Sequence, residues 1–192
     1  MNFLAHLYLA SKTNHSLVGS ILPDLCKPNE WRTLNSDIIQ GCLMHQRVDK
    51  LTDTHPSFIR LKNTISKERR RFAGIILDVA FDHILAKNWD QWHQHPLTVF
   101  TQICNRKLSS EAPVLSDHSQ KVINAMVYGN WLDSYQHIEG IAQAFSGLSR
   151  RFRFENPLAG SEEELINNLE HWSYEFNIIM SDLIIHDYSE LC

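Results

Sequence analysis

Apolar residues recur every three or four positions along almost the whole chain, and this spacing constrains the fold more than any other feature. The clearest row lies near the C-terminus and contains Leu165, Leu169, Trp172, Phe176, Ile179 and Leu183. Steps of three and four bring side chains onto one face of an α-helix, so the row predicts a stripe that packs against a core. The alternation of apolar and polar residues that marks a half-buried strand is absent from the sequence. The spacing therefore predicts an all-α protein.

The apolar pattern divides the chain into a series of expected helices. They cover residues 2–12, 14–21, 35–54, 56–64, 69–88, 96–109, 117–145 (with a break inside) and 161–188. Asn14, Asn35 and Ser161 are placed to cap three helix starts. Glu164 follows Ser161 by three residues, which predicts a capping box. The 192 residues suit one domain with a substantial core, and no repeat or linker divides them. We therefore expect a single helical bundle over residues 1–192.

The composition excludes several classes of protein. A net charge of −4 does not suit a chain that coats nucleic acid, and no run approaches the roughly 18 apolar residues of a membrane-spanning helix. The N-terminus lacks the basic lead and apolar run of a signal peptide. No CxxC pair occurs among Cys26, Cys42, Cys104 and Cys192. Cys192 is the last residue, whereas a prenylation box needs cysteine four from the end. Reduced thiols without a targeting segment predict a cytoplasmic protein.

Two carboxylates interrupt the most apolar of the expected helices. Asp78 and Asp82 are four residues apart, so they share one face of the helix. Ile75 and Leu85 lie on the same row, so this face is expected to pack. Burying an unpaired carboxylate is costly, and two neighbouring carboxylates also repel each other. A cation must therefore compensate them, and both buried arginines and a divalent metal ion meet that need.

The same anomaly occurs in a second helix. The apolar row through Cys42 continues directly into His45 and Asp49. His6 lies on an apolar row near the N-terminus, and Asp24 lies in a turn marked by two prolines. Imidazole and carboxylate together suit manganese, iron or zinc better than calcium. We therefore predict one shared metal site formed by His6, Asp24, His45, Asp49, Asp78 and Asp82.

Each of these residues taken alone also fits a structural role. His6 fits a core histidine bonded to a carbonyl group, and Asp24 fits a turn or cap residue. Asp49 fits an ion pair with a nearby base, Arg47 or Lys50. The prediction of a metal site rests on their occurrence together.

A helical site of histidine and aspartate ligands suits the hydrolysis of phosphate esters. A metal ion lowers the pKa of bound water and draws charge from the phosphoryl oxygens. Arginines hold phosphate well because the planar guanidinium offers two parallel hydrogen bonds. The candidates are Arg47 and the arginines of the run at 67–71, namely Arg69, Arg70 and Arg71. Arg150, Arg151 and Arg153 form another basic cluster, interleaved with Phe152 and Phe154. The runs at 67–71 and 150–153 also fit a solvated surface or the docking of an acidic partner.

Several catalytic motifs are absent from the sequence. It contains no Glu-x-x-His motif of the ferritin-like di-iron proteins, no His-Glu-x-x-His, no P-loop and no GxSxG. The dipeptide His186-Asp187 matches the letters of the histidine–aspartate phosphohydrolases, but it stands near the end of the last expected helix. We assign it no role.

Five segments stand out as motifs, namely MNFLAHL at 1–7, GSILPD at 19–24, MHQRVDKLTD at 44–53, RR at 69–70 and LDVAFDHIL at 77–85. Together they resemble the acyl carrier protein phosphodiesterase family. The resemblance implies an all-helical fold similar to a divergent histidine–aspartate metal phosphohydrolase. It implies manganese as cofactor, with Mg²⁺, Fe²⁺ or Co²⁺ as other candidates, and a place in fatty acid biosynthesis. The implied reaction hydrolyses the phosphodiester of holo-acyl carrier protein, releasing 4′-phosphopantetheine from the carrier's serine.

The resemblance also implies roles for individual residues. The six predicted metal ligands match polar positions of the family, and Asp82 takes part in catalysis as well. Arg47 steadies the phosphate, and His83 is a candidate acid for the leaving serine oxygen, although it also fits a helix histidine bonded to a neighbour. Substrate binding is expected at Arg47, Arg69, Arg70, Arg151 and Arg153. The chain has Gln46 where the family often has a second arginine, and Pro23 where a smaller residue is expected.

Other functions share these features. A metal phosphohydrolase acting on nucleotides or other small phosphate esters needs the same site. A helical module that binds acyl carrier protein without catalysis needs only the fold, with the acids in ion pairs. A domain that has kept the fold and lost activity is a third alternative, given Gln46.

Overall fold

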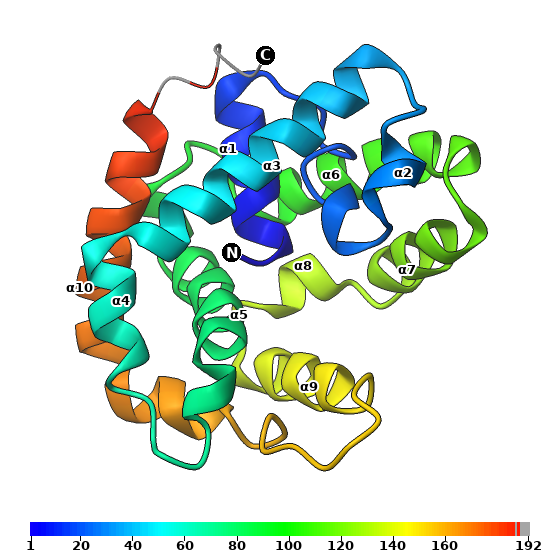
Figure 1. Ribbon diagram of the computed structural model, residues 1–192. Helices are drawn as coiled ribbons and strands as arrows, with labels where there is room; N and C mark the ends of the chain where they lie inside the picture. The colour runs from blue at the N-terminus through cyan, green and yellow to red at the C-terminus, as the bar shows by residue number, and fades with distance from the viewer. Residues whose placement is uncertain (187, 189–192) are drawn as a thin grey trace.

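The most apolar helix of the chain, α5 (Ala73–Lys87), forms the centre of the molecule (Figure 1). Eleven of its fifteen residues are buried. The computed structural model describes residues 1–186 and 188. Within them, α5 packs against four helices, namely α1 (Phe3–Thr13), α4 (Pro56–Lys62), α9 (Ile138–Ser149) and α10 (Glu162–Ile185). The surroundings of α5 explain why its sequence is apolar on nearly every face.

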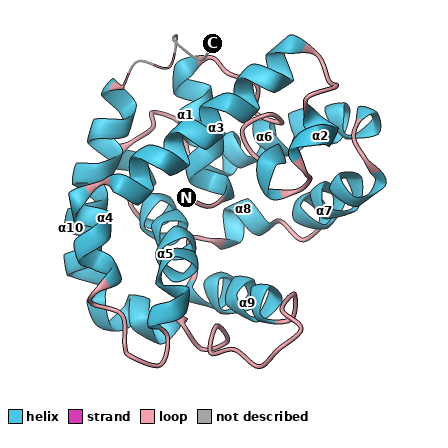
Figure 2. Cartoon of the chain, viewed as in Figure 1, coloured by secondary structure: helices cyan, strands magenta, loops and turns pink. Residues whose placement is uncertain are grey.

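Helices make up all the regular structure of residues 1–186 and 188 (Figure 2). The remaining α-helices are α2 (Pro28–Trp31), α3 (Ser36–Thr54), α6 (Leu97–Glu111), α7 (Asp117–Tyr128) and α8 (Trp131–Ser134). Single 3₁₀ turns occur at Leu22–Asp24, Arg70–Phe72, Trp89–Gln91 and Ala112–Val114. The predicted all-α class is confirmed. None of the described helices has the length and apolar character needed to cross a membrane.

The C-terminal apolar stripe packs as predicted. Trp172 and Phe176 of α10 are fully buried, and the ring of Phe176 lies 5.2 Å from that of Phe81 in α5. The indole Nε1 of Trp172 donates a 3.0 Å hydrogen bond to Thr64 Oγ1. Burying a side chain such as Phe176 stabilises the fold by about 2–3 kcal/mol. The stripe therefore holds α10 against the central helix. Two predictions fall outside the described residues, namely those for Cys192 and for Asp187 of the His186-Asp187 dipeptide.

Two local predictions are wrong. The second expected helix is a set of turns, because Asn14 ends α1 in the left-handed region with φ 56° and ψ 37°. The expected capping box is also missing at the start of α10. Ser161 Oγ donates to the carbonyl oxygen of Pro157 at 3.1 Å, and the Glu164 carboxylate accepts from the backbone N–H of Ser66 at 3.3 Å. The Glu164 side chain, which the capping-box motif predicts at the start of α10, instead bonds to the distant residue Ser66.

Other boundaries follow the sequence more closely. Asn35 caps α3, and its Oδ1 accepts from the backbone N–H of Ile38 at 3.0 Å. The expected break within 117–145 separates α7, α8 and α9, and Asn130 before α8 has φ 49°. Pro28 opens the short helix α2, which the sequence predicted as part of a turn.

Candidate metal centre and its cavity

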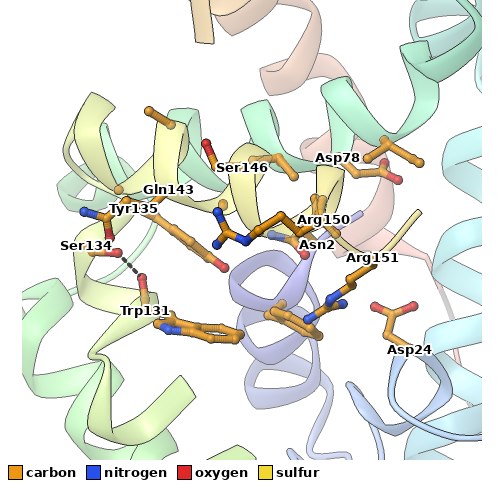
Figure 3. Close-up of a pocket in the computed structure, with 18 of the residues that line it drawn as sticks. Asn2, Asp24, Asp78, Trp131, Ser134, Tyr135, Gln143, Ser146, Arg150 and Arg151 are labelled. Atoms are coloured by element: carbon orange, nitrogen blue, oxygen red, sulfur yellow. Dashed lines mark hydrogen bonds between the residues drawn. The ribbon is translucent and has the colours of Figure 1, made fainter. Parts of the chain in front are cut away.

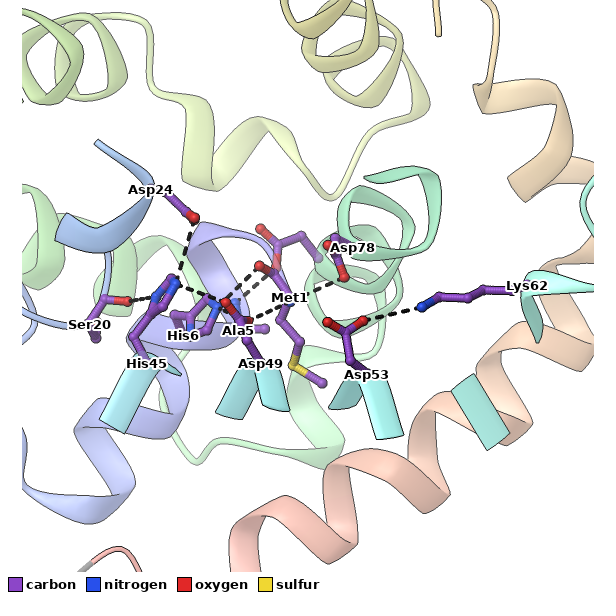
Figure 4. A network of polar contacts seen from close by, with 11 residues as sticks. Met1, Ala5, His6, Ser20, Asp24, His45, Asp49, Asp53, Lys62 and Asp78 are labelled. Carbon is purple, nitrogen blue, oxygen red and sulfur yellow. Dashed lines mark hydrogen bonds and ion pairs between the residues drawn. The ribbon is translucent and has the colours of Figure 1, made fainter. Parts of the chain in front are cut away.

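Two stacked histidines form the centre of the polar cluster shown in Figure 4. His6 comes from α1 and His45 from α3, and their ring centroids lie 3.8 Å apart with planes 16° from parallel. Asp49, one turn after His45, contacts both rings. Its Oδ1 lies 3.1 Å from His6 Nε2, and its Oδ2 lies 3.0 Å from His45 Nε2. Among the described residues, these three side chains offer ligand atoms that lie within 4.8 Å of one another.

A backbone contact fixes the orientation of His45. The Nδ1 of His45 lies 2.7 Å from the carbonyl oxygen of Ser20, which can only accept, so Nδ1 donates. The Nε2 atom therefore faces Asp49 and Asp24, whose Oδ1 lies 3.6 Å away. A second bond of this kind is common at histidines that ligate metal, because it sets the tautomer and the plane of the ring.

The turn at residues 16–24 packs closely against α3 where Gly19 meets Gly41. A Cβ added to Gly41 would lie 2.8 Å from the carbonyl oxygen of Ser16 and 2.9 Å from the Cα of Gly19. Only residues without side chains allow the backbones to approach so closely. The turn that carries Ser20 and Asp24 can then reach His45.

The terminal ammonium of the chain lies between two of the acids. The Met1 nitrogen is buried, 3.1 Å from Asp49 Oδ1 and 3.1 Å from Asp78 Oδ1. Burial alone would lower its pKa, but the charges of Asp78 and Asp49 outweigh that effect and raise the pKa to about 11. Asp24 is the third carboxylate of the cluster, so one ammonium offsets only one of three potential negative charges.

Burial and neighbouring charges set the protonation of the histidines. Burial, followed by the charge of His45, lowers the pKa of His6 to about 3, so His6 is neutral near pH 7. Burial by itself would also lower the pKa of His45, but the hydrogen bond with Asp49 and the charge of Asp24 raise it overall. The same hydrogen bonds outweigh burial at Asp49 and hold the pKa of that carboxyl well below its usual range. Asp49 therefore stays ionised between two imidazoles.

Nearby positive charges only partly compensate Asp24 and Asp78. Burial raises the pKa of Asp24 and of Asp78, and nearby positive charges only partly oppose it. His6 Nδ1 is buried and has no hydrogen-bond partner among the described residues. A divalent ion of the manganese, iron or zinc type fits this site. The site offers one neutral imidazole, a second imidazole held in a fixed orientation, and more carboxylates than the nearby positive charge can neutralise. The donor set therefore suits the predicted metal.

The structure places Asp82 beside this cluster, facing α1. Its Oδ2 accepts from the backbone N–H of Leu4 at 2.8 Å, and its Oδ1 accepts from that of Ala5 at 2.9 Å. Both groups belong to the first turn of α1, where backbone N–H groups lack partners within the helix. Burial raises the pKa of Asp82 to about 7, against the effect of these two bonds. Asp82 thus caps α1 and positions His6.

His83 and Arg47 lie apart from the cluster. His83 Nδ1 donates to the carbonyl oxygen of Tyr135 at 2.8 Å, which anchors the end of α8 to α5. Arg47 lies close enough to Tyr188 for its charge to oppose the rise that burial causes in the pKa of that phenol. Neither residue lines the cavity described below.

Two arginines of the basic run at 67–71 bind backbone carbonyl groups. Arg69 Nε donates to the carbonyl oxygen of Pro157 at 3.2 Å, and its guanidinium lies 3.6 Å from Glu164. Arg70 donates to the carbonyl oxygen of Ile65 at 3.1 Å. The Arg69 contacts tie the start of the Arg70–Phe72 turn to α10 and the loop before it, while the Arg70 contact is local.

A cavity of about 890 Å³ opens beside the acids (Figure 3). Asp24 and Asp78 lie at one end of it in this view, and Arg150 and Arg151 project between them and the far wall. Helices α8 and α9 supply most of that wall, with Trp131, Ser134, Tyr135, Gly140, Gln143, Ala144, Ser146 and Gly147. None of these wall residues belongs to the site predicted from the sequence. The row of small residues in α9, with steps of four and three, was the available signal.

Sequence relatives match nearly the whole chain. The family described as acyl carrier protein phosphodiesterase matches residues 1–183. A protein of that name from Photorhabdus laumondii is 35% identical over 167 residues, which cover 86% of this chain and 84% of the relative. A second, from Serratia proteamaculans, is 33% identical over 177 residues and 92% of each chain. A third, from Yersinia pestis, is 36% identical over 163 residues and 84% of each chain.

No solved structure matches the chain. The resemblance to the histidine–aspartate phosphohydrolase fold therefore stays a prediction, while the helical class is observed directly. A match along 183 residues and identities above 30% over most of each relative define the family. The chain belongs to the acyl carrier protein phosphodiesterase family.

Proposed function

We propose that this protein is a metal-dependent phosphodiesterase that removes 4′-phosphopantetheine from the serine of holo-acyl carrier protein. The observation that carries the proposal is the cluster of His6, His45 and Asp49, which adjoins two acids, Asp24 and Asp78, that line the cavity. The name of the relatives supports the choice of carrier protein as substrate.

The residues of the cluster would hold the metal. His6, His45 and Asp49 supply the closest set of donors, and the Asp24 and Asp78 side chains, 40% and 33% exposed, face the cavity. Manganese suits this mixture of imidazole and carboxylate, and Mg²⁺, Fe²⁺ and Co²⁺ are the other candidates. A divalent ion bound there supplies a nucleophilic water near neutral pH and positive charge for the phosphoryl oxygens.

Arg151 is placed to hold the phosphate. It lines the same cavity as Asp24 and Asp78, and its guanidinium can bind two non-bridging oxygens. In the hydrolysis, the oxygen of water bonds to phosphorus and the bond from phosphorus to the serine oxygen breaks. One proton of the water ends on that serine oxygen, and the phosphate leaves with the pantetheine. Arg69 and Arg70, whose guanidinium groups bind backbone carbonyls, are left with a structural role.

The surface around the cavity suits an acidic protein. Arg153 follows Arg150 and Arg151, and the exposed Phe154 packs against Phe72, with ring centroids 6.4 Å apart. Arg71 lies over the ring of Phe154 at 5.6 Å. This mixture of guanidinium groups and an aromatic side chain favours an acidic partner, and attraction between exposed charges weakens with salt. We propose that the carrier docks on this surface. We also propose that the reaction takes place in the cytoplasm.

The test incubates the purified protein with holo-acyl carrier protein, with and without manganese, and follows the intact mass of the carrier. We expect a manganese-dependent loss of the phosphopantetheine mass, abolished by Asp78→Ala and retained by Asp53→Ala. Asp53 is the matched control, because its side chain is 64% exposed and its carboxylate pairs with Lys62 at 3.2 Å. A folded protein that leaves the carrier intact with every metal would contradict the proposal. Hydrolysis of free nucleotides would then favour the small phosphate esters, and carrier binding alone would favour the non-catalytic module.

A further inference from the structure

The cavity extends well beyond the space that a phosphate needs. In Figure 3 the acids lie at one end, and Ser134, Trp131 and Gln143 lie at the other. A volume of about 890 Å³ is in the upper part of the range of small-molecule sites, roughly 300–1,000 Å³. The far end therefore has room for an elongated group attached to the phosphate.

We propose that this part of the cavity, between α5 and the α8–α9 wall, binds the pantetheine arm, and that Gly147 keeps it open. The inference rests on the proposed function. A folded carrier protein cannot enter a cavity of this size, whereas the flexible arm on the other side of the phosphate can. The diester is thus held with the arm inside and the carrier's serine at the mouth, near Arg150 and Arg153.

The walls match the chemistry of the arm. The arm beyond the phosphate carries two amides, one free hydroxyl group, methyl and methylene groups and a terminal thiol. Gln143 and Ser146 line the cavity, and their side chains make no hydrogen bond to any described residue. A side-chain amide both donates and accepts, so Gln143 can pair with an amide of the ligand. Ile75 and Val79 of α5 add apolar surface to the lining.

Gly147 shows that the cavity is open in front of α9. A Cβ added to Gly147 would meet no atom within 4 Å, so no close packing requires glycine there. Glycine inside a helix destabilises the helix relative to alanine. Gly140 lies two turns earlier on the same wall and differs, because a Cβ there would overlap the carbonyl oxygen of Ser134. Gly140 thus serves packing, and the space beside Gly147 serves a ligand.

The test measures the binding of pantetheine, which lacks the phosphate, to the metal-free protein by saturation-transfer NMR. We expect Gly147→Leu to weaken binding at least tenfold, because the new side chain occupies the cavity. Gly74→Leu is the matched control. Gly74 is also in a helix and outside the cavity wall, and its Cβ would meet only Lys62 Cε at 3.9 Å. Ala144→Leu provides a second obstruction on the same wall if Gly147→Leu does not fold.

The outcomes separate this inference from the proposed function. Wild-type binding of pantetheine that either obstruction abolishes supports the arm site, even if the protein does not hydrolyse the carrier. Equal binding by the wild type and the folded obstructed variants overturns it, as does a wild type that does not bind pantetheine. Unchanged hydrolysis of holo-carrier by Gly147→Leu also overturns the arm site while leaving the proposed function in place.

Discussion

At the scale of single residues, the contacts of each carboxylate decide its role. Asp49 contacts two imidazoles, whereas Asp82 turns both oxygens to backbone N–H groups of α1. The sequence correctly predicted that both lie among apolar residues. It could not separate them, because the contacts of Asp82 are with residues 77 and 78 positions away in the chain. Spacing along one helix predicts a shared face and gives no information on what the facing element offers.

The raised pKa of Asp82 makes a prediction about stability. With a folded pKa of about 7, the native protein holds this proton more tightly than the unfolded chain, where an aspartate titrates near 4. Its contribution to the free energy of unfolding is therefore full below pH 4 and falls as the pH rises to 7. Asp82→Asn should reduce this fall by an amount on the order of 3 kcal/mol. Urea unfolding of the metal-free proteins between pH 4.5 and pH 7.5 measures it, and parallel curves for the two proteins would contradict the assignment.

Arg151 and Arg153 should affect different kinetic constants. Arg151 lines the cavity with Asp24 and Asp78, so Arg151→Gln should lower kcat by about 10²-fold through lost stabilisation of the phosphate. Arg153 lies outside the cavity lining, so Arg153→Gln should raise KM for the carrier several-fold with little change in kcat. Steady-state kinetics at low and high salt measures both. An effect of Arg153→Gln on kcat alone would argue against docking at this surface.

At the scale of secondary-structure elements, the contact of the turn at 16–24 with α3 positions the site. The sequence predicted a helix over 14–21. Asp24, taken alone, was best explained as a turn residue. Asn14 and the approach of Gly19 to Gly41 instead fold this segment onto α3. Helical periodicity predicted the long helices because apolar rows dominate them. The packing of this turn against α3 could not be predicted, because it depends on a backbone contact between distant residues.

Gly41→Ala tests this contact. The added Cβ would lie 2.8 Å from the carbonyl oxygen of Ser16 and 2.9 Å from Gly19 Cα, so the turn must move away from α3. We expect a loss of about 1–3 kcal/mol in the free energy of unfolding and weaker metal binding, because Ser20 would no longer orient His45. Gly74→Ala, whose Cβ meets only ordinary contacts, is the control. Unchanged metal affinity in a destabilised Gly41→Ala protein would limit the contact to stability.

At the scale of the whole molecule, the fold places the predicted metal-binding side chains of the N-terminal half beside a cavity wall formed by the C-terminal half. α1, the turn and α3 supply His6, Asp24, His45 and Asp49, and α5 supplies Asp78. The facing wall comes from α8, α9 and the loop that carries Arg150 and Arg151. The family motifs lie in the first half, so the sequence pointed to the acids and histidines. The cavity wall has no polar motif of its own, and its role follows only from the packing of α9 on α5.

The most direct test of this account is manganese binding to the purified protein, measured by the loss of the free Mn²⁺ EPR signal. We predict that the wild type binds at least one ion per chain and that Asp49→Asn lowers the affinity at least tenfold, because Asp49 contacts both histidines. Asp53→Asn, one turn further along α3 and 64% exposed, should bind as the wild type does. A folded wild type that binds no manganese, or equal binding by Asp49→Asn, would contradict the assignment of this cluster as the metal centre.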